Sequence, residues 1–140
     1  MTKEKARRIE IFFYGLFMDD ALLREKGIKP ENRRVACVDD FRLVIGDRAT
    51  LVPHANGKVY GVLFALTHAE VDTLYSDASV SAYRPEAVFA ELADGTLVPA
   101  LCFNLPVPPS TEERNPQYAS KLKDLAARIG LPTGYVSSIR

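Results

Sequence analysis

The sequence predicts an α+β domain, in which a curled, mixed β-sheet of about six or seven strands forms a barrel-like core with helices packed outside. Three observations favour this fold class. The chain has 140 residues, 47% of them apolar and 26% charged, which is typical of one globular domain. Most apolar segments are short and rich in β-branched or aromatic residues, as strands are. A few other segments carry helix start and stop signals.

The first half of the chain is expected to be mostly strand. The first strand runs from Ile9 to Tyr14 and ends at Gly15, and a short helix follows, with Asp19 as its N-cap and Gly27 just after its end. Further strands are expected at 33–38, 41–45, 50–52 and 58–66. The Asn56-Gly57 pair predicts a hairpin turn between the last two, because both residues tolerate positive φ.

The second half begins with the clearest helix start. Thr67 and Glu70 have the spacing of a capping box, and the helix they open is expected to run to about Tyr75. Two strands follow at 84–92 and 96–104, joined at Asp94-Gly95.

A last helix is expected to begin with Asn115 as N-cap and Pro116 at its first position. It ends before Gly130, and its apolar face consists of Tyr118, Leu122, Leu125, Ala126 and Ile129. We therefore expect a single domain over residues 9–140, preceded by a solvated N-terminal tail over residues 1–8 that carries the basic cluster of Lys3, Lys5, Arg7 and Arg8.

Composition excludes several function classes. Lys plus Arg and Asp plus Glu number 18 each, so there is no basic excess to favour nucleic acid. No apolar run approaches the roughly 20 residues that cross a bilayer, so no membrane contact is expected, and the lack of a signal-peptide pattern favours a cytoplasmic setting. Cys37 and Cys102 are expected to be isolated buried thiols, and His54 and His68 stand too far apart to predict a metal site. No cofactor fingerprint is present, and the oligomeric state stays open.

Several strings, in order, resemble one known family. They are Phe12-Phe13-Tyr14-Gly15, Val35-Ala36-Cys37-Val38 with Phe41-Arg42-Leu43, the strand from Gly57 to Phe64, the segment from Leu74 to Tyr83-Arg84, Pro116-Gln117-Tyr118, and Gly130-Leu131-Pro132 with Tyr135. Together they cover about residues 9–139 and resemble the γ-glutamylcyclotransferase-like (AIG2-like) proteins. The resemblance implies that family's fold and a small γ-glutamyl or amino-acid-like ligand. In the family reaction, the α-amine of a γ-glutamyl group attacks its own γ-carbonyl, which releases 5-oxoproline and an amine.

That reaction needs backbone donors for the developing oxyanion, which a glycine turn after a strand can supply. The resemblance places Tyr14, Gly15, Leu16 and Phe17 at this turn, as candidate substrate-binding residues. Leu16 and Phe17 stand where the family usually has Ser and Asn, so the turn keeps its backbone and loses two polar side chains. A plain structural turn is the alternative interpretation.

The reaction also needs a carboxylate to move a proton. The family's catalytic glutamate falls on Ala78, and the neighbouring Asp77 is the candidate catalytic base if the loop shifts by one residue. A solvated loop carboxylate is the alternative. Glu86 is the other candidate for the base, and it shares one face of its strand with Arg84. If that face lines the pocket, Arg84 is a candidate for binding a substrate carboxylate; otherwise the two form an ordinary surface pair. Tyr135 either reaches the pocket or packs in the core.

Two hypotheses on function follow. The first is an enzyme that releases 5-oxoproline from a γ-glutamyl amine, with Asp77 as base. The second is a non-catalytic module that binds a small ligand or a partner on the same fold, as Leu16, Phe17 and Ala78 would suggest.

Overall fold

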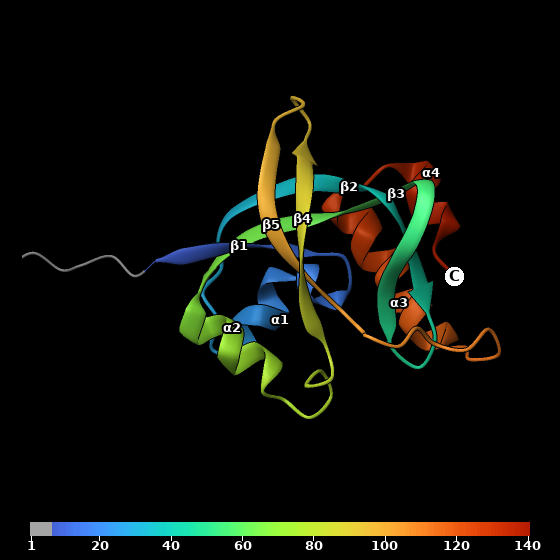
Figure 1. Ribbon diagram of the computed structural model, residues 1–140, viewed down its shortest axis with the longest axis horizontal. Coiled ribbons are helices and arrows are strands. Elements are labelled where there is room, and N and C mark those ends of the chain that lie inside the picture. The colour runs from blue at the N-terminus through green and yellow to red at the C-terminus, as the bar shows by residue number, and fades with distance from the viewer. Residues whose placement is uncertain (1–6) are drawn as a thin grey trace, which may run out of the picture.

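The computed structural model describes residues 7–140, in which five strands form a closed barrel in the order β1-β3-β2-β4-β5 (Figure 1). The neighbouring strands pair antiparallel, except that β1 and β5 meet in parallel at Ile11 and Leu101 and so close the barrel. The strands are β1 (Arg8–Phe13), β2 (Glu31–Ile45), β3 (Ala49–Thr67), β4 (Arg84–Leu92) and β5 (Leu97–Asn104). The α+β class and the curled sheet are confirmed, with fewer strands than the six or seven expected.

The lower number arises because β2 and β3 are long strands that each join two expected ones. The predicted hairpin at Asn56-Gly57 is wrong, since both residues lie inside β3. Asn56 (φ 65) instead faces Asp40 (φ 66) at an irregularity of the β2–β3 ladder, and its N–H donates to Asp40 Oδ1 at 3.1 Å. Positive φ here serves a bulge and not a turn. The real turn between β2 and β3 consists of residues 46–48.

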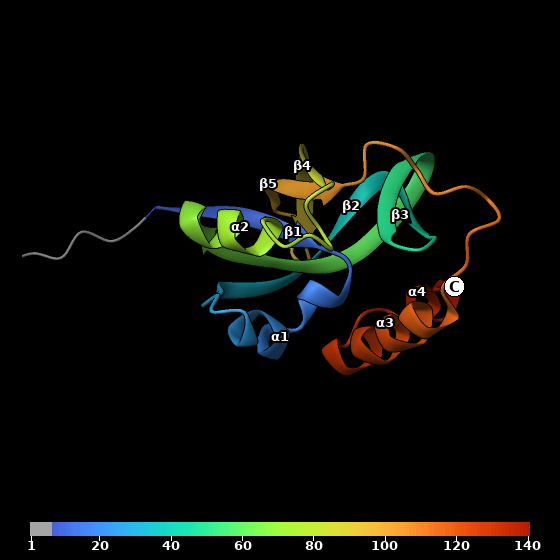
Figure 2. The same cartoon turned by 90° about the horizontal axis from the view of Figure 1, so that it is seen from below.

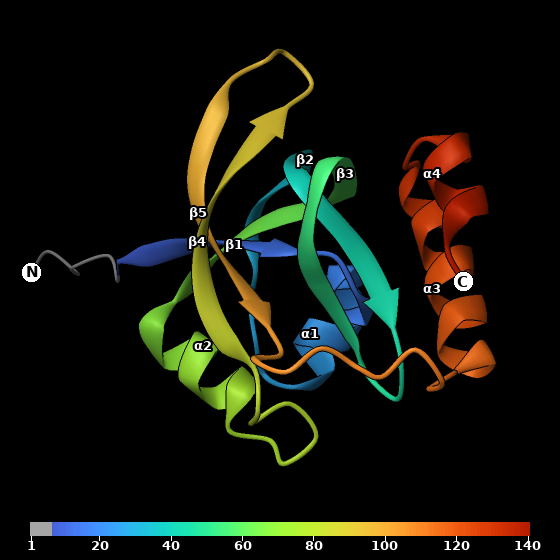
Figure 3. The same cartoon turned by 45° about the vertical axis from the view of Figure 1, so that its right-hand side comes forward.

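The described helices are η1 (Leu16–Met18), α1 (Asp20–Glu25), α2 (His68–Tyr75), α3 (Pro116–Ile129) and α4 (Thr133–Ser138). The views in Figures 2 and 3 place α3 and α4 side by side against the barrel, with α1 on the same side and α2 apart from them. The capping signals at Asp19, Thr67 and Asn115 are confirmed, because each side chain accepts a hydrogen bond from the first turn of its helix. The short helix α4 had no clear signal in the sequence.

Alternating side chains of β1 divide the core in two. Ile11 and Phe13 face the helices, where they join a buried cluster with Leu23 and Leu122. Phe12 and Tyr14 point the opposite way, into the barrel, as the period of a strand requires. Cys37 and Cys102 are buried free thiols, as expected.

The N-terminal boundary differs from the expected one. Arg8 belongs to β1 and its side chain is only 22% exposed, so it is not part of a solvated tail. Lys3, Lys5 and the rest of the expected tail up to residue 6 lie outside the described residues.

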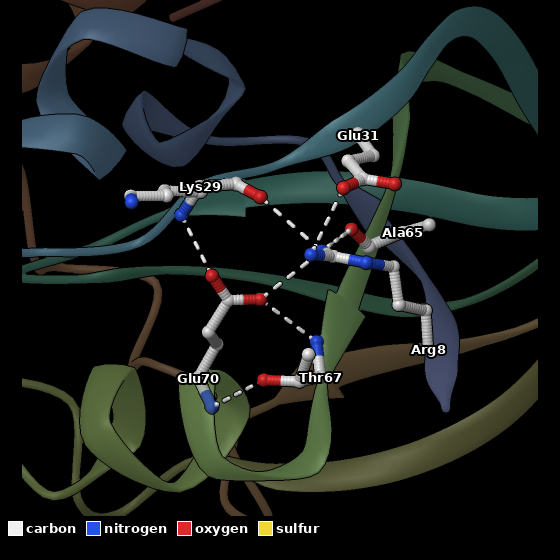
Figure 4. A network of polar contacts seen from close by, with 6 residues as sticks. All are labelled: Arg8, Lys29, Glu31, Ala65, Thr67 and Glu70. Carbon is white, nitrogen blue, oxygen red and sulfur yellow. Dashed lines mark hydrogen bonds and ion pairs between the residues drawn. The ribbon is translucent and has the colours of Figure 1, made fainter. Parts of the chain in front are cut away.

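Arg8 instead anchors a polar network beside α2 (Figure 4). Its guanidinium pairs with Glu31 at 3.0 Å and with Glu70 at 3.2 Å. Glu70 also accepts the backbone N–H groups of Thr67 at 2.8 Å and of Lys29 at 2.7 Å. Burial opposes the charge on Glu70, but these hydrogen bonds and Arg8 outweigh burial and lower its pKa. The network therefore fixes the start of α2, whose far end leads into the pocket described below.

Candidate functional site

A pocket of about 330 Å³ opens where β1 ends and the chain turns into η1. Five segments supply its lining residues. They are Phe12 to Phe17 from β1 and the turn, Leu22 and Lys26 from α1 and its end, Asp47, Arg48 and Ala49 at the β2–β3 turn, Tyr75, Ser79, Val80 and Tyr83 around the segment after α2, and Phe103 and Tyr118 from β5 and α3. The predicted residues Tyr14, Gly15, Leu16 and Phe17 thus all line one pocket.

Aromatic rings form the inner wall of this pocket. Tyr75 stacks on Phe103 with 3.9 Å between ring centroids and 13° between planes. The edge-on ring of Phe17 lies 6.2 Å from Tyr75, and the tilted ring of Tyr83 lies 6.5 Å from it. Rings that support one another in this way give a large and rigid apolar surface. Burial raises the pKa of both Tyr75 and Tyr83, so their hydroxyls stay neutral.

Gly15 is required in the turn by close packing. Its φ is −112°, which any residue adopts, but a Cβ at this position would lie 2.5 Å from the hydroxyl oxygen of Tyr118. Burial raises the pKa of Tyr118 to about 12, and a backbone hydrogen bond from Leu16 acts in the opposite direction. Tyr118 packs against both core clusters, as its place on the apolar face of α3 predicted, and it also lines the pocket.

Asp77 and Ala78 are both exposed and are not among the residues that line the pocket. The Asp77 carboxylate accepts hydrogen bonds from the backbone N–H of Ser79 at 2.9 Å and from its hydroxyl at 2.7 Å. These bonds lower the pKa of Asp77, which makes it a weaker base. From this segment, Ser79 and Val80 are the residues that reach the pocket.

Glu86, Arg84 and Tyr135 also lie outside the pocket lining. Glu86 is exposed and accepts a hydrogen bond from the Asn104 side chain at 3.1 Å. Arg84 is exposed and donates to the carbonyls of Ser81 at 2.8 Å and Tyr83 at 2.9 Å. The ring of Tyr135 packs against Tyr60 with centroids 5.4 Å apart. Its hydroxyl is buried near the Tyr60 backbone, and no group in residues 7–140 meets hydrogen-bond geometry with it.

Two charged residues of the pocket, Asp47 and Arg48, were missed by the sequence analysis. They form the β2–β3 turn, whose shape is fixed by a hydrogen bond from Gly46 N–H to the Arg48 carbonyl at 3.1 Å. Glu113 accepts the N–H of Asp47 at 3.1 Å, and the Asn115 side chain donates to the Asp47 carbonyl at 3.0 Å. The Gly-Asp pair is itself a turn signal, but the stronger Asn56-Gly57 signal drew the predicted turn elsewhere.

Across residues 7–140, no three His, Cys, Asp or Glu side chains gather as metal ligands would. No helix in that range is long and apolar enough to cross a membrane.

Comparison with known proteins gives one consistent result. Residues 11–122 match the family model described as gamma-glutamyl cyclotransferase, AIG2-like. A solved structure named gamma-glutamyl cyclotransferase superposes with a TM-score of 0.80 at 19% identity, over 96% of this chain and 89% of that one. A human protein described as uncharacterized superposes with a TM-score of 0.78 at 20% identity, with the same coverage of both chains. YkqA from Bacillus subtilis superposes with a TM-score of 0.74 at 22% identity, over 93% of this chain and 52% of YkqA. A search of curated proteins found no match.

Proposed function

Because the chain belongs to the gamma-glutamyl cyclotransferase, AIG2-like family, we propose that it binds a small γ-glutamyl or amino-acid-like ligand in the aromatic pocket without the family's proton transfer. One observation carries this proposal. The position where the resemblance places the catalytic glutamate is the exposed Ala78, and the same segment offers the pocket only Ser79 and Val80.

Cyclotransfer requires a base beside the α-amine of the substrate. At neutral pH the α-amine of a γ-glutamyl group is protonated, so it cannot attack until a base takes its proton. Such general acid–base catalysis is worth roughly 10²–10⁴-fold in rate, and the base must lie within hydrogen-bond reach. The Asp77 carboxylate is turned to Ser79 instead, and its lowered pKa makes it a weaker base. Asp47, the acidic residue that lines the pocket, belongs to the β2–β3 turn and not to the segment where the resemblance places the base. An ion pair with Asp47 stabilises the ammonium in its charged form, which favours binding over attack.

Binding, in contrast, needs only what the pocket has. A volume of about 330 Å³ is near the lower end of known small-ligand sites, which suits a ligand of one or two amino acids. The stacked wall of Tyr75 and Phe103 gives apolar contact. The charged residues Lys26, Asp47 and Arg48 give polar contacts at the same pocket.

The test measures binding and product together. Calorimetry with a panel of γ-glutamyl amines and γ-glutamyl amino acids should show binding, while chromatography detects no 5-oxoproline above the protein-free rate. Val80→Trp, which fills the pocket, should abolish binding. Val107→Trp is the matched control, because Val107 is 77% exposed and lies outside the pocket. Release of 5-oxoproline above the protein-free rate would overturn the proposal.

Cyclotransfer with Asp77 as base is the second candidate function. The observation in its favour is that Asp77 lies two residues before Ser79, a wall residue, on the same segment. If this candidate holds, the wild type releases 5-oxoproline and Asp77→Asn does not. Release that survives Asp77→Asn would remove Asp77 from the reaction.

A further inference from the structure

We propose that the Asp47-Arg48 turn recognises the charged head of an α-amino acid, with Asp47 binding the ammonium and Arg48 the carboxylate, while the aromatic wall holds an apolar or aromatic side chain. This inference rests on the proposed function, because it names the ligand class of the same pocket. It concerns two residues that the family resemblance did not single out.

The charged groups of Asp47 and Arg48 are both accessible to a ligand. Asp47 and Arg48 are exposed and both line the pocket. Among the contacts of residues 7–140, Asp47 is held only through its backbone N–H and carbonyl. None of the ion pairs in that range includes Asp47 or Arg48. Backbone hydrogen bonds lower the pKa of the Glu113 carboxyl, and the Arg48 charge helps to lower it without forming such a pair. Charged side chains are usually left unpaired where solvent or a ligand satisfies them.

Hydrogen bonds hold the Asp47-Arg48 turn in place before any ligand binds. Glu113 and Asn115 fix the backbone of Asp47 from one side. On the other side, the hydroxyl of Tyr83 donates to the carbonyl of Ala49, the residue after the turn. The same Tyr83 belongs to the aromatic wall. A fixed turn loses little conformational entropy when it binds, which favours affinity.

The two charges of the turn match those of an α-amino acid. An α-amino acid carries one ammonium and one carboxylate on the same carbon atom. A carboxylate accepts hydrogen bonds from an ammonium, and the planar fork of arginine suits a carboxylate. One acid and one arginine on a single short turn therefore complement this head group. In the same pocket, Tyr75 and Tyr83, with rings 6.5 Å apart, offer the apolar surface that an aromatic side chain would cover.

The test uses three probes that differ only in the head group. L-Phenylalanine carries both charges, 3-phenylpropanoate lacks the ammonium, and 2-phenylethylamine lacks the carboxylate. Calorimetry should show that each truncated probe binds roughly tenfold more weakly than L-phenylalanine, or worse, as expected for the loss of a charge-assisted hydrogen bond.

Variants then assign each charge. Asp47→Asn should remove the preference for L-phenylalanine over 3-phenylpropanoate, and Arg48→Gln should remove its preference over 2-phenylethylamine. Lys26→Gln should weaken binding less than Arg48→Gln, and the reverse order would overturn the assignment of the carboxylate to Arg48. Asp72→Asn and Arg33→Gln serve as controls, since both residues are exposed and lie outside the pocket.

The outcomes separate this inference from the proposed function. Equal binding of all three probes overturns recognition of the head group and leaves small-ligand binding intact. If none of the three binds but γ-glutamyl amines do, this inference alone fails. If neither set binds, both proposals fail.

Discussion

Replacing Gly15 by alanine tests the contact that shapes the pocket turn. A Cβ at Gly15 would lie 2.5 Å from the hydroxyl oxygen of Tyr118, and the next nearest atom, Cζ of the same ring, is at 3.9 Å. Only the hydroxyl is therefore in the way. Overpacking of this kind costs about 1–3 kcal/mol in the free energy of unfolding. For a chain of this size, that lowers Tm by about 3–10 °C.

The assay is a double-mutant cycle followed by urea and thermal unfolding. Tyr118→Phe removes the obstructing oxygen, so Gly15→Ala should cost little in that background, because the remaining contact at 3.9 Å is ordinary packing. The coupling between the two substitutions should then equal most of the loss, about 1–3 kcal/mol. Gly134→Ala is the matched control, since no atom lies within 4 Å of its added Cβ, and it should be nearly neutral.

An equal cost of Gly15→Ala in the Tyr118 and Phe backgrounds would refute this reasoning. It would mean that the glycine serves the turn in some way other than making room for the hydroxyl.

Three further predictions concern stability and thiol chemistry. The fold lowers the pKa of Glu70. The ionised Glu70 carboxylate therefore adds to the free energy of unfolding above its unfolded pKa of about 4.3, and this stabilisation is lost as the pH falls through the pKa of the folded state. Urea unfolding at about pH 6 and about pH 3 should therefore show a larger loss for the wild type than for Glu70→Gln, and equal losses would contradict it. Asn115→Ala removes an N-cap that also holds Asp47, and should cost about 1–2 kcal/mol in chemical unfolding. Burial raises the pKa of the Cys37 thiol, and it raises the pKa of the Cys102 thiol to about 12. A thiol reagent at mildly alkaline pH should therefore label the native chain far more slowly than the urea-unfolded chain. Similar labelling rates would contradict this, because they would show that the thiols are accessible in the fold.

Signals that act over a few residues predicted the fold well. The capping box of Thr67 and Glu70 and the N-caps at Asp19 and Asn115 depend on contacts within one helical turn, and all three are present. Asn56-Gly57 failed because positive φ at Asn56 suits a bulge as well as a hairpin. The bulge is favoured because β3 pairs with β2 on both sides of Asn56, at residues 49–53 and 58–63. That pairing is a tertiary contact, which the local sequence does not contain.

The candidate site was predictable only in part, for the same reason. Tyr14 to Phe17 follow a recognisable strand and glycine turn, and they line the pocket. Asp47 and Arg48 reach it through strand pairing and through Glu113 and Asn115, which lie more than sixty positions away. The hydrogen bonds from Ser79 set the direction of the Asp77 side chain, and the family motif does not predict them.

The central claim is that the pocket binds a γ-glutamyl ligand without converting it, and one nuclear magnetic resonance titration tests it directly. γ-Glutamylphenylalanine is added to isotope-labelled protein, while amide signals and product signals are recorded in the same tube. We expect the amides of Gly15, Leu16 and Ser79 to shift, with no 5-oxoproline formed faster than in a sample without protein. Accumulation of 5-oxoproline above that rate, or shifts confined to residues outside the pocket, would contradict the account.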